Sequence, residues 1–285
     1  MNHARVPVPV LLGPLGAPAD RELAESFLRH FGLRADQPPL DLLRAVAAAF
    51  TQLPYENLTK IIKQDQEGAA VRARRLPAEV LADHFRGGAG GTCFSLTATL
   101  LQLVRALGWQ AEPLLADRRY GENTHCALLV RIDGRPHLLD PGYLILNPIP
   151  LDLDRETRIV TSFNELRLRP AADGRRLDLA TVQGHQDKYR LSFKTEPAEA
   201  GEFLAAWDAS FDWDMMRYPV LTQVRQGRQL YLQGRRFQER DRQAAQREEL
   251  AGDQLAGRIA HSFGIAPHIV ARALEILHRK GEPYG

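Results

Sequence analysis

Cysteine is scarce in this chain of 285 residues: Cys93 and Cys126 are its only two. Neither belongs to a Cys-x-x-Cys pair or to a Cys/His cluster, which argues against a disulfide framework and against a structural zinc site. The chain is long enough to bury a substantial apolar core without such cross-links. We therefore expect a reducing compartment and no bound metal.

An excess of charge of one sign is also lacking. The chain has 37 basic and 35 acidic residues, for a net charge of +2, so a nucleic-acid surface built on bulk electrostatics is not expected. A secretory signal needs a basic start and an uninterrupted apolar run. The first apolar stretch has no such start and contains Pro7, Pro9, Pro14 and Pro18. We expect a cytoplasmic protein that is not inserted in a membrane.

The remaining composition is that of a globular protein, with 44% hydrophobic and 25% charged residues. Apolar residues recur with helical spacing in the first part of the chain, strand alternation follows, and the last part mixes the two patterns. This order predicts an α+β fold. The expected helices span residues 20–31, 39–52, 77–85, 93–107, 249–263 and 267–279, and the expected strands span 126–132, 135–140, 157–160, 166–169, 189–193, 220–225 and 229–233.

A glycine-rich approach leads to Cys93, because four of the five positions 87–91 are glycine. The run permits close backbone approach but lacks the Gly-Lys-Ser/Thr ending of a phosphate loop. A helix is predicted from Cys93 to about Leu107, with Thr92 as its N-cap. The first turn of a helix favours a thiolate, so Cys93 is a candidate nucleophile. A small buried apolar residue is an equally good interpretation of Cys93.

The Asp133-Gly134 pair is typical of a two-residue hairpin turn between two strands. With such a turn, Ala127 pairs with Asp140. His125 lies two residues before Ala127 and therefore shares a face with Asp140, within side-chain reach along the diagonal. By the same alternation Cys126 points to the other face, and we interpret it as a packed thiol.

Cys93, His125 and Asp140 together provide the parts of a thiol acyl-transfer site. The cysteine would be the nucleophile, the histidine its base, and the aspartate the group that fixes the histidine tautomer. A strand-end histidine with a local hydrogen bond, and a turn aspartate ahead of Pro141-Gly142, are the separate alternatives. One shared site explains the three residues more economically.

Several short motifs are distributed over nearly the whole length of the chain. They are Leu53-Pro54-Tyr55-Glu56-Asn57-Leu58, Gly90-Gly91-Thr92-Cys93-Phe94, Thr124-His125, Leu139-Asp140-Pro141-Gly142-Tyr143, the segment 230–240 and His261-Ser262-Phe263-Gly264-Ile265. In this order they resemble the arylamine N-acetyltransferases, a branch of the papain-like and transglutaminase-like superfamily. The resemblance implies an N-terminal helical bundle over residues 1–110 with the nucleophile, a central β-barrel over 111–197 with the histidine and aspartate, and a C-terminal α/β lid over 198–285.

The resemblance also implies an activity. Acetyl-CoA or another acyl-CoA would serve as co-substrate and not as a bound cofactor, and the acyl group would pass through Cys93 to an amine, arylamine or hydrazine nitrogen. Tyr55, Phe94 and Tyr143 are expected to contact substrate. The expected partners are thus a small amine acceptor and an acyl thioester donor, with an acyl carrier protein as a further candidate. No metal, redox cofactor, nucleic acid or membrane is expected, and the oligomeric state stays open.

Three rival functions fit the same residues. An amide synthase would take a long acyl chain from a carrier protein and release it as an amide. A transglutaminase-like amidase or protease would complete the cycle with water. A binding protein would keep the fold with a triad that does not turn over.

The chain departs from the family pattern around its motifs. Family members usually carry arginine where this chain has Ala89, glutamate and asparagine where it has Ser95 and Thr97, and glycine where it has Leu144. Arg86 lies three residues before Ala89, so the loop contains an insertion or reaches its salt bridge differently. Because Ala89 replaces the arginine and Ser95 replaces the glutamate, neither charge is left without its partner. Leu144 narrows the space in which coenzyme A would approach. We predict that acetyl-CoA is a poor donor and that another acyl-CoA or a carrier-bound acyl group reacts faster.

Overall fold

A computed structural model describes residue 15, residues 20–183 and residues 186–284 of the chain. The proline-containing lead named above lies outside these residues. Among the helices of the described ranges, none is long and apolar enough to cross a membrane.

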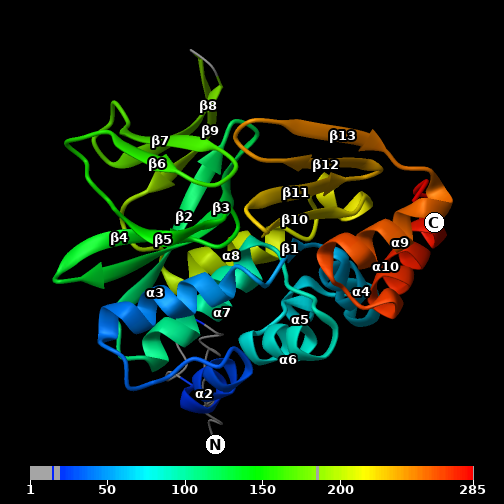
Figure 1. The fold of residues 1–285 in the computed structure, drawn as a ribbon, viewed down its shortest axis with the longest axis horizontal. Coiled ribbons are helices and arrows are strands. Elements are labelled where there is room, and N and C mark those ends of the chain that lie inside the picture. The colour runs from blue at the N-terminus through cyan, green and yellow to red at the C-terminus, as the bar shows by residue number, and fades with distance from the viewer. Residues whose placement is uncertain (1–14, 16–19, 184–185, 285) are drawn as a thin grey trace, which may run out of the picture.

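The N-terminal part is helical (Figure 1). Its elements are α2 (Arg21–His30), α3 (Pro39–Phe50), α4 (Leu58–Glu67), α5 (Ala70–Ala73), α6 (Pro77–Gly87) and α7 (Cys93–Ala106). Local chemistry sets several of their starts. Asp20 caps α2 by accepting a hydrogen bond from the Leu23 amide at 3.0 Å. Pro39 and Pro77 occupy the first turns of α3 and α6, where a missing amide hydrogen costs nothing.

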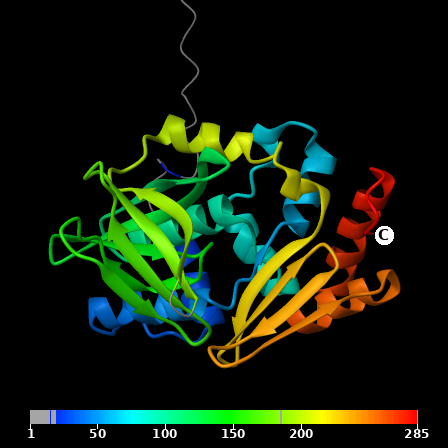
Figure 2. The ribbon, with the colours of Figure 1, turned by 90° about the horizontal axis from the view of Figure 1, so that it is seen from above.

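Helix α7, which begins at Cys93, runs through the middle of this part of the molecule (Figures 1 and 2). The periodicity predicted one buried face, but every residue from Cys93 to Val104 is buried. The reason is its setting, because α2, α3 and α6 pack on it from the helical side and strands β2 (Ala111–Arg118) and β3 (Gly121–Ile132) pack on it from the other. Because α7 is packed on both sides, the position of its first turn, which contains Cys93, is fixed.

The central part forms an eight-stranded antiparallel sheet that curls into a barrel-like shape, as expected. Its strand order is β5-β4-β3-β2-β9-β8-β7-β6. Apolar side chains of alternate positions fill its interior as a cluster separate from the helical core. Besides β2 and β3, the strands are β4 (Arg135–Asp140), β5 (Ile145–Pro150), β6 (Thr157–Val160), β7 (Glu165–Pro170), β8 (Arg176–Gln183) and β9 (Gln186–Lys194).

The predicted hairpin register between β3 and β4 is confirmed. Ile132 pairs with Arg135 and Leu128 pairs with Leu139. The two turn residues, Asp133 and Gly134, have φ values of +50° and +74°. This is the left-handed backbone that a type I′ turn requires and that an Asp-Gly pair tolerates.

The C-terminal part is a five-stranded antiparallel sheet with helices against it (Figure 2). Helix α10 packs on α9 and on α4 of the N-terminal part. Strands β12 and β13 were not predicted, because charged and polar residues interrupt their alternation and β13 is exposed throughout. The elements are α8 (Ala200–Ala209), a 3-10 turn at Asp214–Arg217, β10 (Val220–Arg225), β11 (Arg228–Gln233), β12 (Arg236–Arg240), β13 (Ala245–Glu249), α9 (Gly252–Phe263) and α10 (Pro267–Arg279).

One strand of this C-terminal sheet comes from the N-terminal part. Strand β1 (Tyr55–Glu56) lies at its edge and pairs with β10, although the sequence predicted only an ordered break there. The Glu56 amide also donates to the Gly91 carbonyl at 2.9 Å, so β1 touches the approach to Cys93. Asn57 follows, fully buried, and its amide group donates to the carbonyls of Met215 at 2.5 Å and Tyr218 at 2.8 Å.

The expected domain limits fall between elements. Helix α7 ends at Ala106 and β2 begins at Ala111, while β9 ends at Lys194 and α8 begins at Ala200. A three-domain division at residues 110 and 197 therefore stays a prediction that cuts no helix or strand.

Candidate active site

His125 on β3 and Asp140 at the end of β4 contact each other as the hairpin register predicted. His125 Nε2 lies 2.7 Å from Asp140 Oδ2, and both side chains are fully buried. The second carboxylate oxygen accepts a hydrogen bond from the Tyr143 amide at 2.8 Å. Burial by itself lowers the pKa of His125, but Asp140 and a contact with Cys93 outweigh burial and raise that pKa to about 9.

Cys93 is the first residue of α7, with Thr92 in the N-cap position, and its side chain is buried. The pKa of its thiol is well below the ordinary value. The largest cause is a hydrogen bond from Cys126, and a hydrogen bond with His125 adds to it, so that together they outweigh burial. A low pKa on the thiol beside a high pKa on the imidazole favours a thiolate–imidazolium pair at neutral pH.

Cys126 lies on the opposite face of β3 from His125, as alternation predicted. It belongs to the core cluster that contains α7, whereas its neighbour Ala127 belongs to the interior of the barrel-like sheet. Its Sγ lies 3.5 Å from Thr97 Oγ1, and burial raises its pKa well above the ordinary value. Both cysteines are free, and the described ranges contain no group of three metal-ligating side chains. Cys126 is thus a packed thiol that also touches the candidate nucleophile.

A buried arginine that the sequence analysis missed holds the loop before Cys93. Arg75 is 2% exposed, and its guanidinium lies 3.6 Å from the carboxylate of the fully buried Glu56 and 2.6 Å from that of Asp83. It also donates to Thr59 Oγ1 at 2.6 Å and to the Gly90 carbonyl. The loop therefore rests on a guanidinium that comes from the segment between α5 and α6.

The contacts of Arg75 show how the loop forms a salt bridge although it has Ala89 where an arginine was expected and Arg86 three residues earlier. Ala89 is buried and Arg86 is exposed at the end of α6, so neither supplies the expected salt bridge. The loop reaches a salt bridge through Arg75 instead. No local pattern marks Arg75 in the sequence, because it lies in an irregular stretch next to another arginine, Arg74.

Gly90 and Gly142 lie so close to neighbouring atoms that neither position has room for a side chain. A Cβ at Gly90 would lie 1.8 Å from the Pro54 carbonyl oxygen. A Cβ at Gly142 would lie 2.9 Å from both Cys93 Cβ and His125 Cε1. Gly142 therefore places backbone without a side chain against the candidate triad, and it also lines the space beyond.

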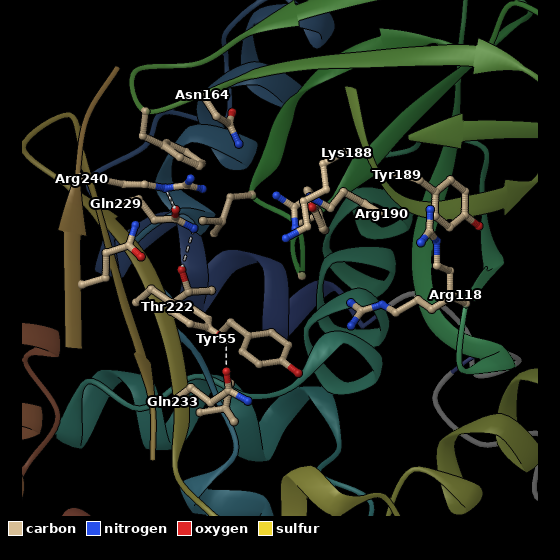
Figure 3. Close-up of a pocket in the computed structure, with 18 of the residues that line it drawn as sticks. Tyr55, Arg118, Asn164, Lys188, Tyr189, Arg190, Thr222, Gln229, Gln233 and Arg240 are labelled. Carbon is tan, nitrogen blue, oxygen red and sulfur yellow. Dashed lines mark hydrogen bonds between the residues drawn. The ribbon is translucent and has the colours of Figure 1, made fainter. Parts of the chain in front are cut away.

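That space is a cleft of about 710 Å³ between the barrel-like sheet and the C-terminal sheet (Figure 3). Of the residues predicted to bind substrate, Tyr55 and Tyr143 line the cleft. Phe94 does not line it, because it is fully buried with its ring 5.2 Å from that of Phe203. Leu144 also lines the cleft and has a φ of +63°, a conformation that favours glycine, the residue that the resemblance led us to expect there.

The cleft is strongly cationic although the whole chain is nearly neutral. Among the described residues that line it, none is aspartate or glutamate and six carry basic side chains. Three of these are exposed and three are partly buried. They come from the end of β2 and the turn after it, from β9, from β12 and from β13, so no single run of basic residues in the sequence revealed them. The exposed side chains are Arg119, Lys188 and Arg247, and the partly buried ones are Arg118, Arg190 and Arg240.

Arg118 ends β2 and lies next to the candidate triad. Its Nη2 is 3.3 Å from His125 Nδ1, the ring nitrogen that Asp140 does not contact, and its Nη1 donates to the Tyr120 hydroxyl at 2.6 Å. Burial lowers the pKa of Arg118, but Tyr120 and Tyr55 outweigh burial and raise it. A guanidinium that lines the cleft thus stands beside the imidazole.

Comparison with known proteins adds to these observations. A model of the N-acetyltransferase family matches residues 39–270. A search among curated proteins finds no match. Among solved structures, the arylamine N-acetyltransferase of Mycobacterium abscessus has a TM-score of 0.76 and 20% identity, over 96% of this chain and 99% of that one.

Two further solved structures bear on the site. The Mycobacterium marinum arylamine N-acetyltransferase in complex with CoA has a TM-score of 0.74 and 18% identity, over 90% of this chain and 98% of that one. The Bacillus cereus arylamine N-acetyltransferase, described with a Cys-His-Glu catalytic triad, has a TM-score of 0.68 and 15% identity, over 86% and 99%.

At these identities the solved structures show a shared fold. The family match extends over most of the chain, from α3 into α10, and includes every motif named above up to residue 265. The chain therefore belongs to the arylamine N-acetyltransferase family, a class of N-acyltransferase enzymes.

Proposed function

We propose that this protein transfers an acyl group from a coenzyme A thioester to an arylamine or hydrazine nitrogen, through a thioester on Cys93. The observation that carries the proposal is the 2.7 Å contact between His125 and Asp140, with a low-pKa Cys93 thiol beside the same histidine. The CoA complex of the Mycobacterium marinum relative supports coenzyme A as the carrier of the acyl group.

In the first half-reaction the Cys93 thiolate attacks the carbonyl carbon of the thioester and forms a new C–S bond. The first amides of α7 have no partner within the helix and can stabilise the oxyanion. The bond to coenzyme A then breaks, and its thiolate takes the proton from His125 Nδ1. The acyl group remains on Cys93, and the imidazole is neutral.

In the second half-reaction an amine attacks the acyl carbon, and the neutral His125 takes its proton. The Cys93 thiolate leaves, so the resting ion pair is restored. Asp140 holds His125 Nε2 throughout and leaves Nδ1 for proton transfer. Tyr55 and Tyr143 contact the substrate in this scheme, since both line the cleft.

The donor is the open part of the proposal. Leu144 narrows the cleft beside Gly142, so we keep the prediction that acetyl-CoA is a poor donor and that a larger acyl-CoA or a carrier-bound acyl group reacts faster. The amide-synthase rival differs only in this donor, and the hydrolase rival only in using water as acceptor. The cytoplasmic location stays a prediction from the sequence.

Mass spectrometry of the intact protein tests the proposal. Incubation with a panel of acyl-CoAs and an acylated carrier protein should add one acyl group, located within residues 91–105, and an arylamine should remove it. Cys126→Ser is the matched control and should still be acylated. An adduct on Cys126, or no adduct with any donor, would refute the mechanism, and equal removal by water alone would indicate a hydrolase.

The thiolate–imidazolium pair predicts a pH dependence of alkylation. Because the pKa of Cys93 is lowered, iodoacetamide should modify it at a pH well below about 8.5, the ordinary thiol pKa. Removing His125 removes part of this stabilisation, so the inflection of the pH–rate profile should move to higher pH. Rates are measured for His125→Ala and Asp140→Asn in a Cys126→Ser background, which leaves one thiol and keeps a hydroxyl donor beside it. Identical profiles would mean that the triad is not assembled.

A further inference from the structure

The two cysteines of the chain touch each other, and the proposed acyl transfer uses only one of them. The Cys126 thiol donates a hydrogen bond to the Cys93 sulfur. The packing of β3 on α7 explains this contact, because Cys126 Sγ also lies 3.5 Å from Oγ1 of Thr97, which follows Cys93 by one helical turn. Both thiols are free and buried. A second sulfur therefore lies beside the candidate nucleophile.

Cys93 has the properties of an oxidisable thiol. Cys126 and His125 lower its pKa well below the ordinary value, and the thiolate is the form that a hydroperoxide oxidises. A small oxidant reaches it from the cleft, because Gly142 lines the cleft and lies against Cys93 without a side chain of its own. The first product is a sulfenic acid, which thiols still reverse. A second hydroperoxide converts it to a sulfinic acid, which they do not.

We propose that Cys93 and Cys126 form a redox modification site, in which a hydroperoxide oxidises Cys93 to a sulfenic acid and Cys126 converts that acid to a reversible disulfide. With hydrogen peroxide, the Cys93 thiolate attacks one oxygen, the O–O bond breaks, and the departing hydroxide takes the proton of His125 to give water. Cys126 Sγ then attacks the sulfenic sulfur and forms the S–S bond. The S–O bond breaks, and its oxygen leaves with the Cys126 proton as a second water. Two thiols are thus oxidised by two electrons, and one peroxide is reduced.

The contact between the sulfurs decides which reaction follows the sulfenic acid. Burial raises the pKa of Cys126 and keeps most of it protonated, although the Thr97 hydroxyl lowers that pKa in part. Groups held in reactive contact nevertheless reach effective concentrations of about 10⁵ M or more, far above that of any free hydroperoxide. A disulfide needs the sulfurs about 2.05 Å apart, so both side chains rotate from their resting contact. We therefore expect disulfide formation to outrun the second oxidation.

Peptide mapping of the peroxide-treated protein tests the proposal. Dilute wild-type protein is treated with hydrogen peroxide, blocked with N-ethylmaleimide and digested with trypsin. The chain should lose two hydrogen atoms, and one disulfide should join the tryptic peptides 87–105 and 120–131. Dithiothreitol should restore both thiols. Addition of two oxygen atoms to Cys93 with no disulfide inside the chain would overturn the inference, and so would a disulfide that forms only between two chains.

Cys126→Ser removes the thiol that resolves the sulfenic acid. Dimedone, which traps sulfenic acids, should label Cys93 more strongly in this variant than in the wild type, and further peroxide should add two or three oxygen atoms. Each protein is then compared with its own untreated rate of acyl transfer. Dithiothreitol should restore the wild-type rate and leave the loss in Cys126→Ser permanent, because sulfinic acid is not reduced by thiols. Equal labelling and equal recovery in the two proteins would show that Cys126 takes no part.

Cys93→Ser is the matched control. It leaves Cys126 as the only cysteine, and this thiol should resist the same peroxide treatment because burial raises its pKa. Oxidation of Cys126 there at the wild-type rate would mean that the first attack is on the other sulfur, against the proposed order of steps.

The mass measurements do not depend on acyl transfer. If Cys93 accepts no acyl group but the disulfide with Cys126 forms, the proposed function fails and the redox site stands. If Cys93 is acylated and peroxide yields only sulfinic acid, the proposed function stands and the redox site is refuted.

Discussion

Replacing Cys93 by serine is expected to lower the steady-state rate of acyl transfer by about 10⁴-fold or more, as removal of a nucleophile does in other covalent mechanisms. A serine hydroxyl stays protonated where the thiol is ionised, so His125 has no thiolate to pair with. The rate is measured as release of coenzyme A thiol in the presence of an arylamine and the preferred donor.

Cys126→Ser is the matched control, because it replaces sulfur by oxygen at the thiol that contacts Cys93. The serine keeps a donor for the Cys93 thiolate, and its rate should stay within about tenfold of the wild type. A Cys93→Ser protein that keeps more than a small fraction of the wild-type rate, or a larger loss in Cys126→Ser, would contradict the assignment.

Replacing Arg75 by leucine is expected to lower the free energy of unfolding by about 3–5 kcal/mol, because it leaves buried negative charge without its partner. Glu56 is 0% and Arg75 2% exposed, and the guanidinium also holds the Gly90 carbonyl. Urea unfolding at neutral pH measures the change. Adding Glu56→Gln to Arg75→Leu should restore part of the loss, since the unpaired charge is then removed.

Arg72→Leu serves as the comparison for this loss. Arg72 lies three residues before Arg75 and forms a 3.4 Å ion pair with Glu67, but its side chain is 65% exposed. An exposed pair contributes about 1 kcal/mol or less. If Arg75→Leu were no more destabilising than Arg72→Leu, the salt bridge behind Gly90 would not support the loop.

The contact between His125 and Asp140 was predictable because it depends on a short, rigid piece of sequence. A two-residue Asp-Gly turn sets the register of a hairpin, and the register sets which side chains share a face. The start of α7 at Cys93 was predictable for a similar reason, since the glycine run, Thr92 and the apolar spacing are all local signals.

Arg75 and Arg118 could not be found in this way. Arg75 reaches Glu56, Thr59 and Gly90, and Arg118 reaches His125 only because β2 and β3 pair and turn back tightly. These contacts are set by tertiary packing, whereas the sequence presents two arginines among many. Strand β1 was missed for a related reason, because two residues carry too little strand propensity to be recognised without their partner β10.

The contacts of Asn57 have a consequence for how this protein is made. Asn57 lies between β1 and α4, yet its partners, at residues 215, 218 and 220, lie about 160 positions later in the chain. Synthesis delivers the N-terminal end first. A nascent chain that stops before residue 215 therefore already carries Cys93, His125 and Asp140 but leaves the polar groups of Asn57 without these partners. The C-terminal sheet, which forms the side of the cleft opposite the barrel-like sheet, can be completed only after the last third of the polypeptide has left the ribosome.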